Sequence, residues 1–373
     1  MLLTKKNDSL ENILSRALDG RELSKEDLIF LLSLDDERDM ALLFEAARQQ
    51  RQRYFGHQIF LYGFVYFTTY CRNDCVFCHY RNSNTQLPRY RKDPKEILAA
   101  VDVLAKAGVH LIDLTMGEDP VFYKNDGEKF QEIASLIRHI KATTGLAVMV
   151  SPGAAPEHVL RDLATSGADW YACYQETHNR CLFDSLRTGQ EYHERLDKKI
   201  QARRHGMLIE EGILSGAGDS LEDLADSILK MKELDVDQAR IMTFVPQKGT
   251  PLADLTPPDA MRELLTIALL RLVLPDRLIP ASLDVDGLAG LKKRLHAGAN
   301  VVTSIVVPGQ GFAGVANVHL DIEESRRTPQ AVRAVLEECH LQPAVLKDYL
   351  DWINQRRTAH GWKGQDNYAG AGL

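Results

Sequence analysis

The stretch IFLYGFVYFTTYCRNDCVFCHY, residues 59–80, decides the fold of this chain and holds three of its six cysteines. Its first part, Phe60–Thr68, is a run of apolar and aromatic residues that predicts a buried strand. Cys71, Cys75 and Cys78 follow directly in the spacing C-x3-C-x2-C. The three thiols are therefore expected on the loop at the carboxyl end of a strand.

Outward from this stretch, short apolar runs alternate with helical runs, each with its own start signal. Asp93, Pro94 and Glu96 form one such signal, with an N-cap, a proline at the first helical position and an acid at the third. The further strands are predicted over 109–116, 146–150, 169–174, 207–214, 238–245, 277–283 and 299–306. Helices are predicted over 93–107, 129–143, 156–167, 193–204, 220–234, 259–272, 288–296 and 326–339.

Eight strands that alternate with helices predict a parallel sheet. Eight such units within about 250 residues favour a closed (β/α)8 TIM barrel, with α/β as the fold class. A doubly wound open sheet is the alternative. In a barrel, the cysteine loop lies at the rim where active sites are built.

The ends of the chain differ from this pattern. Residues 10–53 are predicted to be helical, with Ser24 and Asp27 as a capping box. We expect an N-terminal helical extension over 1–55, which closes the bottom of the barrel, and the barrel itself over 56–345. A C-terminal helix and a flexible tail are expected over 346–373, which end in NYAGAGL.

Composition excludes several classes of protein. The chain has 373 residues, of which 45% are hydrophobic and 26% charged, as in a globular protein. Its net charge of -7 argues against nucleic acid or an anionic membrane as partner. No apolar run reaches the roughly 20 residues of a membrane span, and no export signal is apparent. We therefore expect a cytoplasmic protein whose cysteines are free, metal-bound or catalytic.

The cysteine triplet indicates a metal site. Thiolates suit iron–sulfur clusters or zinc. Three ligands leave one iron of a four-iron cube without a protein thiolate, and an open metal position is what a site needs to bind a reactant. Two alternatives stay open: a zinc knot with His79 as fourth ligand, and three unrelated buried cysteines.

The loop C-x3-C-x-aromatic-C, with Phe77 in the aromatic slot, resembles the signature of radical S-adenosylmethionine (SAM) enzymes. The resemblance implies a barrel of the radical SAM type and a 4Fe-4S cluster on Cys71, Cys75 and Cys78. It implies S-adenosyl-L-methionine as second cofactor, cleaved to a 5'-deoxyadenosyl radical that takes hydrogen from the substrate. An electron donor such as flavodoxin or ferredoxin is implied as partner.

Further motifs resemble the cofactor contacts of this family. Gly117 and Glu118 match part of its Gly-Gly-Glu motif, in which Met116 replaces the first glycine, and Glu118 is expected on the SAM ammonium. Glu176, in YQET, is expected on the ribose. A solvated loop acid is the alternative for Glu118.

The segment EYHERLD resembles a stretch of the biotin synthase-like subgroup, whose arginine pairs with the SAM carboxylate. That arginine maps onto Arg195, with Arg187 as competitor and a surface salt bridge as the alternative. Gly212, in GILSG, is expected on the adenine side, unless it is a plain turn. The resemblance adds Phe77, Tyr80 and Ser151 to the cofactor-binding set.

Longer stretches, among them HLIDLTMGEDP, RIMTFVPQKGTPL and RLIPASLDVDGL, resemble a branch of this subgroup that rearranges the carbon skeleton of L-lysine. Lysine carries one carboxylate and two ammonium groups, and each needs a partner in a buried pocket. Arg240 is expected to grip the carboxylate bidentately. Asp284 with Ser282, and Asp113 beside Thr115, are expected to receive the ammonium groups.

Other interpretations remain for these four catalytic candidates and for the activity. The alternative for the four residues is a salt-bridge network that only fills the barrel, and Ser304 is a weaker candidate of the same kind. A different biotin synthase-like enzyme, such as a hydrogenase maturase, is the alternative activity. It would favour a second cysteine group, which Cys173, Cys181 and Cys339 do not form. A non-catalytic iron–sulfur or zinc protein would bind no SAM.

Overall fold

A computed structural model describes residues 2–316 and 326–362 of the chain, with side chains from residue 10 onward. In these residues, eight parallel strands form one sheet in the order β6-β5-β4-β3-β2-β1-β8-β7. A parallel bridge between Gln238 and Leu278 joins its two ends. The prediction of a TIM barrel is confirmed, and the open sheet is wrong. The strands are β1 (Gln58–Thr68), β2 (Leu111–Met116), β3 (Ala147–Ser151), β4 (Trp170–Ala172), β5 (Leu208–Ser215), β6 (Gln238–Thr243), β7 (Pro280–Ser282) and β8 (Val301–Ile305).

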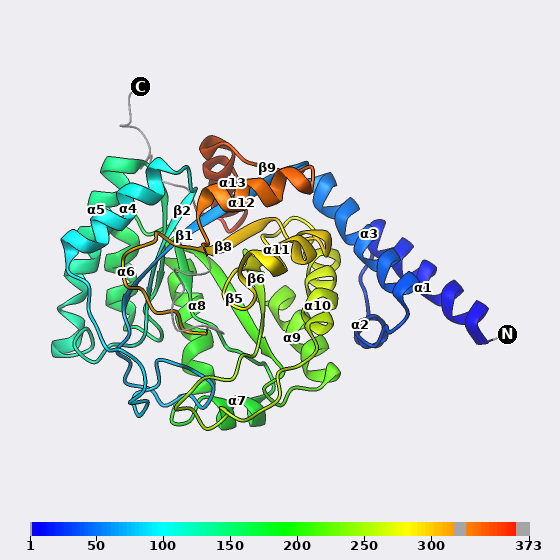
Figure 1. Cartoon of the computed structure of the whole chain (residues 1–373), viewed down its shortest axis with the longest axis horizontal. Helices are drawn as coiled ribbons and strands as arrows, with labels where there is room; N and C mark the ends of the chain where they lie inside the picture. The colour runs from blue at the N-terminus through cyan, green and yellow to red at the C-terminus, as the bar shows by residue number, and fades with distance from the viewer. Residues whose placement is uncertain (1, 317–325, 363–373) are drawn as a thin grey trace.

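Helices surround the barrel (Figure 1). Asp93 caps α4 and forms the predicted capping box with Glu96. Three elements were not predicted: α7 (Arg180–Leu186), which follows β4; β9 (Gln342–Pro343), which pairs with β1; and the 3-10 turn η1 (Asn125–Gly127). The surrounding helices are α4 (Pro94–Lys106), α5 (Phe130–Thr144), α6 (Glu157–Thr165), α8 (Tyr192–Arg204), α9 (Leu221–Glu233), α10 (Ala260–Val273), α11 (Gly287–His296) and α12 (Pro329–Glu338).

The strands are buried on both faces, because side chains fill the barrel and helices cover it. All residues of β1 after Gln58 are buried, which explains why its sequence is apolar throughout instead of alternating. Gly63 lies where α4 packs on β1, and a Cβ there would come within 2.9 Å of Leu104 Cδ1. β4 is shorter than predicted because its pairing with β5 is interrupted: Ala172 pairs with Glu210, and the next parallel bridge joins Glu176 to Ile213 after a slip in register.

The N-terminal helices are α1 (Leu2–Leu18), α2 (Lys25–Leu32) and α3 (Glu37–Phe55). The capping box of Ser24 and Asp27 is present. α2 and α3 pack against α9 and α10, and Figure 1 shows this unit projecting from the side of the barrel. The expectation that these helices close the bottom of the barrel is therefore wrong.

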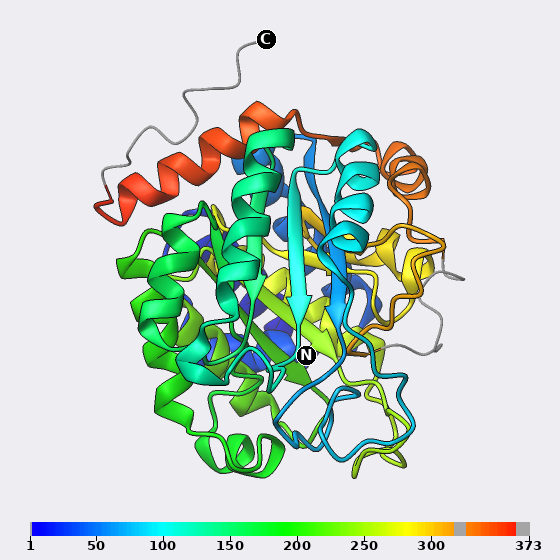
Figure 2. The same cartoon turned by 90° about the vertical axis from the view of Figure 1, so that its left-hand side faces the viewer.

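The bottom is covered by α13 (Leu346–Ala359), which crosses the amino ends of the strands (Figure 2). The hydroxyls of Tyr349 and Tyr62 are 2.6 Å apart and buried. Trp352 stacks on Trp170 with ring centroids 5.9 Å apart. α13 therefore closes the bottom of the barrel, a role that was expected of the N-terminal helices. Its aromatic side chains face the amino ends of β1 and β4. The predicted tail lies, from residue 363 on, outside the described residues.

An ion-pair group fastens α13 to the barrel. Asp237, fully buried before β6, accepts from the backbone N–H of Ile209 at 2.9 Å and from Arg356 Nε at 2.9 Å, and lies 2.8 Å from His360 Nε2. Burial alone would raise the pKa of Asp237, but hydrogen bonding to His360 and the charges of His360 and Arg356 hold this pKa below its ordinary value. The carboxylate therefore joins β5, β6 and α13.

We expect Asp237→Ala to lower the free energy of unfolding by about 3 to 5 kcal/mol, because it leaves Arg356 buried without this partner. Urea unfolding followed by circular dichroism measures the change. Asp351→Ala, which removes an exposed ion pair with Lys347 on the same helix, should change stability by less than about 1 kcal/mol. Equal stability of the two variants would show that α13 is not held by Asp237.

No helix among the described residues is long and apolar enough to cross a membrane.

Candidate active site

A cavity opens at the carboxyl ends of the strands, opposite α13. Together with its mouth it holds about 1350 Å³ of empty space, enough for more than one small molecule. Every predicted site residue except Gly212 lines it. These residues are Cys71, Cys75, Phe77, Cys78, Tyr80, Asp113, Gly117, Glu118, Ser151, Glu176, Arg195, Arg240, Ser282 and Asp284.

The three cysteines face this cavity from one loop, with Cys75 buried and the other two half-buried. Burial, helped by Glu118 and Cys75, raises the pKa of the Cys71 thiol to about 11. Burial and the other two thiols raise the pKa of Cys78 well above its ordinary value. Burial thus favours the neutral form of Cys71 and Cys78 when no metal is bound. Three sulfur donors around one cavity fit a 4Fe-4S cluster.

The zinc alternative gains no support. No group of three or more His, Cys, Asp or Glu side chains within the described ranges is arranged to hold a single metal ion. His79 is buried beside Cys78, and its Nδ1 has no hydrogen-bond partner among the described residues. Its backbone N–H donates to the carbonyl of Val315.

Gly117 is the motif glycine that the structure requires. A Cβ at this position would lie 2.6 Å from the carbonyl oxygen of Tyr70 and 3.0 Å from Cys71 Cβ. The backbone N–H of Arg72 also donates to the carbonyl of Glu118 at 2.8 Å. The cysteine loop therefore rests on the end of β2, and the position held by Met116 can carry a side chain.

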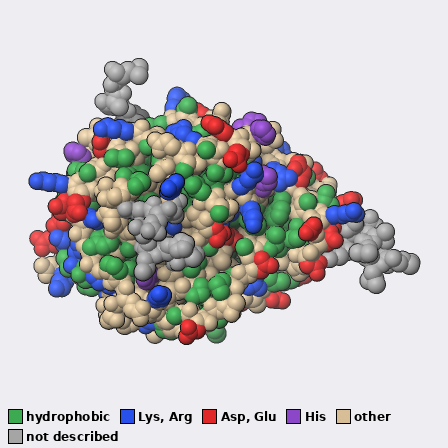
Figure 3. All heavy atoms as spheres, in the orientation of Figure 1, with side chains coloured by type: hydrophobic (Ala, Val, Ile, Leu, Met, Phe, Trp, Pro, Cys, Tyr) green, Lys and Arg blue, Asp and Glu red, His purple; other side chains and the backbone are tan. Residues whose placement is uncertain are grey.

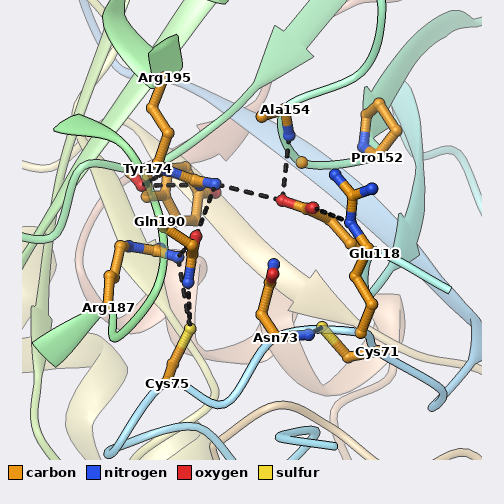
Figure 4. A network of polar contacts seen from close by, with 12 residues as sticks. Cys71, Asn73, Cys75, Glu118, Pro152, Ala154, Tyr174, Arg187, Gln190 and Arg195 are labelled. Atoms are coloured by element: carbon orange, nitrogen blue, oxygen red, sulfur yellow. Dashed lines mark hydrogen bonds and ion pairs between the residues drawn. The ribbon is translucent and has the colours of Figure 1, made fainter. Parts of the chain in front are cut away.

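Glu118 is the centre of a polar network (Figure 4). Its Oε2 lies 2.9 Å from Arg72 Nε, and its Oε1 accepts from the backbone N–H of Ala154 at 3.1 Å and from Arg195 Nη1 at 3.3 Å. Burial alone would raise the pKa of Glu118, but Arg195, the Ala154 N–H and Arg72 together hold it below its ordinary value. Glu118 is thus a buried carboxylate in the cavity wall and not a solvated loop acid.

Gly153, which was not predicted, makes this network possible. A Cβ at Gly153 would lie 2.2 Å from Glu118 Cγ, and its φ of +80° also favours glycine. The sequence signal is SPG directly after the third strand.

Glu176 is held in an unusual backbone conformation, with φ of +67°. Such a left-handed conformation at a non-glycine residue is costly and is concentrated at functional sites. Arg187 Nη2 donates to Glu176 Oε1 at 2.5 Å, whereas the buried Oε2 has no partner among the described residues. Burial raises the pKa of Glu176 against the opposing charges of Arg187 and Arg195. One carboxylate oxygen is left for a ligand.

Arg195 is buried, so the surface salt bridge is excluded. It donates to the carbonyl of Tyr174 at 2.9 Å, to Glu118, and to Gln190 Oε1 at 3.2 Å. Arg187, its competitor, donates to Glu176 and, at 3.6 Å, to Cys75 Sγ. The two arginines thus flank the cluster side of the cavity from the loop and helix that follow β4.

The remaining cofactor candidates differ in how they are engaged. Phe77 lies under the guanidinium of Arg187, 5.5 Å from ring centroid to Cζ. Tyr80 donates its hydroxyl to the carbonyl of Ala313, so its ring is the part left for a ligand. Ser151 Oγ lies 3.4 Å from Asp113 Oδ1, closer to the floor than to the cysteines. Gly212 does not line the cavity, because the ring of Tyr174 occupies the space above it, 2.8 Å from where a Cβ would be.

On the floor of the cavity, Arg240 is already partly engaged. Its Nε donates to Glu210 at 2.6 Å and its Nη1 to Thr303 Oγ1 at 3.0 Å. The hydroxyl of Tyr174 donates to the second oxygen of Glu210 at 2.9 Å. Arg240 Nη2 is buried without a hydrogen-bond partner among the described residues. Nε and Nη1 are thus engaged, and Nη2 is the nitrogen left for a ligand carboxylate.

Asp284 is surrounded by donors. Its Oδ2 accepts from Ser282 at 3.1 Å and from Ser304 at 2.7 Å, and its Oδ1 accepts from Tyr66 at 3.1 Å. Arg327 Nη1 lies 2.8 Å from Oδ1. The structure therefore brings Ser282, Asp284 and Ser304 together, and it adds an arginine that the sequence did not indicate.

Asp113 is the isolated carboxyl group of the floor. It is buried, it forms no ion pair within the described part of the chain, and Ser151 Oγ lies 3.4 Å from its Oδ1. Burial first, and then the charge of Glu210, raise its pKa to about 7. The group is therefore poised to change charge near neutrality.

Sequence reasoning missed Glu210, Tyr174, Gln190 and Arg327. Alternation along β5 could have found Glu210, because it lies two residues before Gly212 and so on the same face of the strand. Gln190 and Arg327 lie on loops, where no periodicity indicates their direction.

A parallel barrel with three cysteines at the end of its first strand, beside a buried cavity lined with acids and arginines, defines a radical SAM enzyme. Residues 65–231 match the radical SAM superfamily. The chain is 41% identical to the 3-methylornithine synthase of Methanosarcina acetivorans, over 92% of this chain and 96% of that protein. It belongs to the 3-methylornithine synthase family.

Two further comparisons agree with this assignment. The crystal structure of methylornithine synthase (PylB) superposes with a TM-score of 0.84 at 39% identity, over 91% of this chain and 99% of that one. The hydrogenase maturase subunit HydE of Thermotoga maritima is 33% identical over 76% of this chain and 81% of its own length. The lower identity and coverage of HydE favour the synthase over the maturase.

Proposed function

We propose that this protein isomerises L-lysine to (3R)-3-methyl-D-ornithine, a step in pyrrolysine biosynthesis. The observation that carries this proposal is the charge of the cavity floor. Arg240 is matched by Glu210, and Asp284 by Arg327, so Asp113 is the floor carboxyl group without an ion-pair partner in the described part of the chain. Ionised Asp113 makes the floor singly negative, and lysine, with two ammonium groups and one carboxylate, is singly positive. A buried site requires such a balance.

The cofactor would occupy the upper part of the cavity. Cys71, Cys75 and Cys78 would hold the 4Fe-4S cluster, and Glu118, Glu176 and Arg195 would bind the polar groups of SAM. When bound, the two groups supply a 5'-deoxyadenosyl radical, which takes a hydrogen atom from the substrate. Gly117 and Gly153 support this part of the site by allowing the cysteine loop and Glu118 to pack closely.

The lysine would lie below, on the floor. Nη2 of Arg240 would bind its carboxylate, and Asp113 and Asp284, with Ser282, would bind its ammonium groups. Substrate and product are isomers, so the chain need only orient lysine and retain its fragments while one carbon–carbon bond breaks and another forms. The buried floor suits this task, since it keeps water from the reacting atoms.

We further infer that the cluster is reduced by a small electron carrier such as flavodoxin or ferredoxin. A maturase-like activity is less well supported, because Cys173 is buried, Cys181 exposed and Cys339 half-buried, and they form no second metal-binding group among the described residues.

The test is an anaerobic incubation of the reconstituted protein with SAM, a reductant and L-lysine, followed by mass spectrometry. We expect a new amino acid that has the mass of lysine but a different retention time, formed only when SAM is present. Release of 5'-deoxyadenosine without this product would show that the substrate is wrong. Absence of both from a protein with a full cluster would contradict the proposal as a whole.

Lysine binding should depend on pH through Asp113. Above its pKa of about 7 the group is a carboxylate that attracts an ammonium, and below this pH it is neutral. Affinity should therefore fall as the pH drops below 7, by up to about tenfold per pH unit. Calorimetric titration of SAM-loaded, unreduced protein measures it. Asp113→Asn should bind lysine weakly at every pH, and a flat profile in the unmodified protein would contradict the role of Asp113.

A further inference from the structure

Gln190 connects the cysteine loop with both arginines of the cofactor site. It lies between α7 and α8, and Figure 4 shows its side chain between Arg187, Arg195 and Cys75. Its Nε2 donates to Cys75 Sγ at 3.0 Å. Its Oε1 accepts from Arg187 Nη1 at 3.3 Å and from Arg195 Nη1 at 3.2 Å.

The two arginines settle which way the amide faces. A guanidinium has only donors, so the amide oxygen must point at Arg187 and Arg195. The NH2 group is then directed at the sulfur of Cys75. This orientation follows from chemistry and does not depend on telling nitrogen from oxygen by shape.

We propose that Gln190 is a positioning residue that tunes the iron–sulfur cluster: it donates a hydrogen bond to the Cys75 sulfur and so raises the reduction potential of the cluster. The inference rests on the cluster assigned to Cys71, Cys75 and Cys78 under the proposed function. It does not depend on lysine as substrate.

The physical reason is electrostatic. Reduction adds negative charge to the cluster and its thiolates, and an N–H directed at a sulfur stabilises that charge, so hydrogen bonds to the sulfurs are among the determinants of the potential. Cys75 receives side-chain donors from Gln190 and, at 3.6 Å, from Arg187. Cys71 accepts from the backbone N–H of Asn73 at 3.5 Å, which no side-chain substitution removes. The hydrogen bond to the Cys75 sulfur is thus one that a substitution of a neutral side chain, Gln190, can remove.

The amide also couples this sulfur to the cofactor arginines. Gln190 Oε1 draws Arg187 and Arg195 toward each other, and these arginines hold Glu176 and Glu118 respectively. A variant that keeps the oxygen but loses the donor should therefore separate tuning from positioning. Gln190→Glu keeps the oxygen but replaces the donor by a negative charge, whereas Gln190→Met removes donor and acceptor at similar length without adding a charge.

The experiment is a redox titration of the reconstituted holoenzyme, followed by electron paramagnetic resonance of the reduced cluster. We expect both Gln190→Glu and Gln190→Met to have a lower midpoint potential than the unmodified protein. SAM affinity should weaken in Gln190→Met and be largely kept in Gln190→Glu. Gln131→Met, on α5 and bonded to Asp162, is the matched control and should leave the potential unchanged.

An unchanged or raised potential in Gln190→Met, which loses the donor without gaining a charge, would overturn the proposal. So would loss of the cluster from both variants, since a residue that only tunes the cluster is not needed to assemble it. A shifted potential in a protein that does not convert lysine would leave this inference standing and refute the proposed substrate. If the potential is unshifted in the variants but the protein converts lysine, the proposed function stands and the role of Gln190 in tuning the cluster is refuted.

Discussion

Replacement of Cys75 by alanine is expected to remove the iron–sulfur chromophore entirely. The three thiols line one cavity, and a 4Fe-4S cluster bound there would already lack a fourth protein thiolate. With Cys75 removed, only two thiolates would remain to hold it. The brown colour, the iron content and all SAM cleavage should disappear together after anaerobic reconstitution. Absorbance spectra and iron analysis measure this directly.

Cys181→Ala is the matched control for this prediction. Cys181 is exposed on α7 and does not line the cavity, so the variant should reconstitute with iron content like that of the unmodified protein. A cluster of full intensity in Cys75→Ala would refute the ligand assignment.

Replacement of Arg240 by leucine should greatly weaken lysine binding and leave SAM binding intact. The substitution removes Nη2, which has no hydrogen-bond partner among the described residues. It also leaves Glu210 buried without its ion pair, and the unpaired Glu210 then repels a carboxylate. Losing one partner of a buried charge pair costs about 2 to 5 kcal/mol, so the affinity for lysine should fall by a factor of roughly 30 or more. Calorimetry with lysine and with SAM, on unreduced protein, separates the two ligands.

The double variant Arg240→Leu/Glu210→Gln guards against a folding artefact. It removes the unpaired buried charge and should recover stability, since replacing both members of a pair is much less costly than breaking it. Lysine binding should remain as weak as in Arg240→Leu. Recovery of lysine binding, or loss of SAM affinity in place of lysine affinity, would show that Arg240 does not hold the substrate.

Much of the barrel could be predicted because its signals are local. The capping residues Asp93 and Ser24 act within one helical turn, and each forms the predicted capping box. The short strands β4 and β7 were predicted too long, because strand ends depend on pairing with neighbouring strands, which no local signal records. Pairing of β4 with β5 slips after Ala172, and β7 begins only at Pro280. The role of α13 was missed for a related reason: nothing local in a helix says which end of a barrel it will cover.

The sequence by itself determined the class of chemistry: three thiols with fixed spacing after a strand, and acids and arginines at the ends of later strands. Spacing along one strand also determined which residues share a face, as for Ser282 and Asp284. Only the tertiary structure decided which charges neutralise one another. Glu210 lies 30 residues from Arg240, and Arg327 lies 43 from Asp284. These pairings make Asp113 the floor carboxyl group without an ion-pair partner in the described part of the chain, because a charge in a buried cavity is set by its neighbours in space, whatever their distance along the chain.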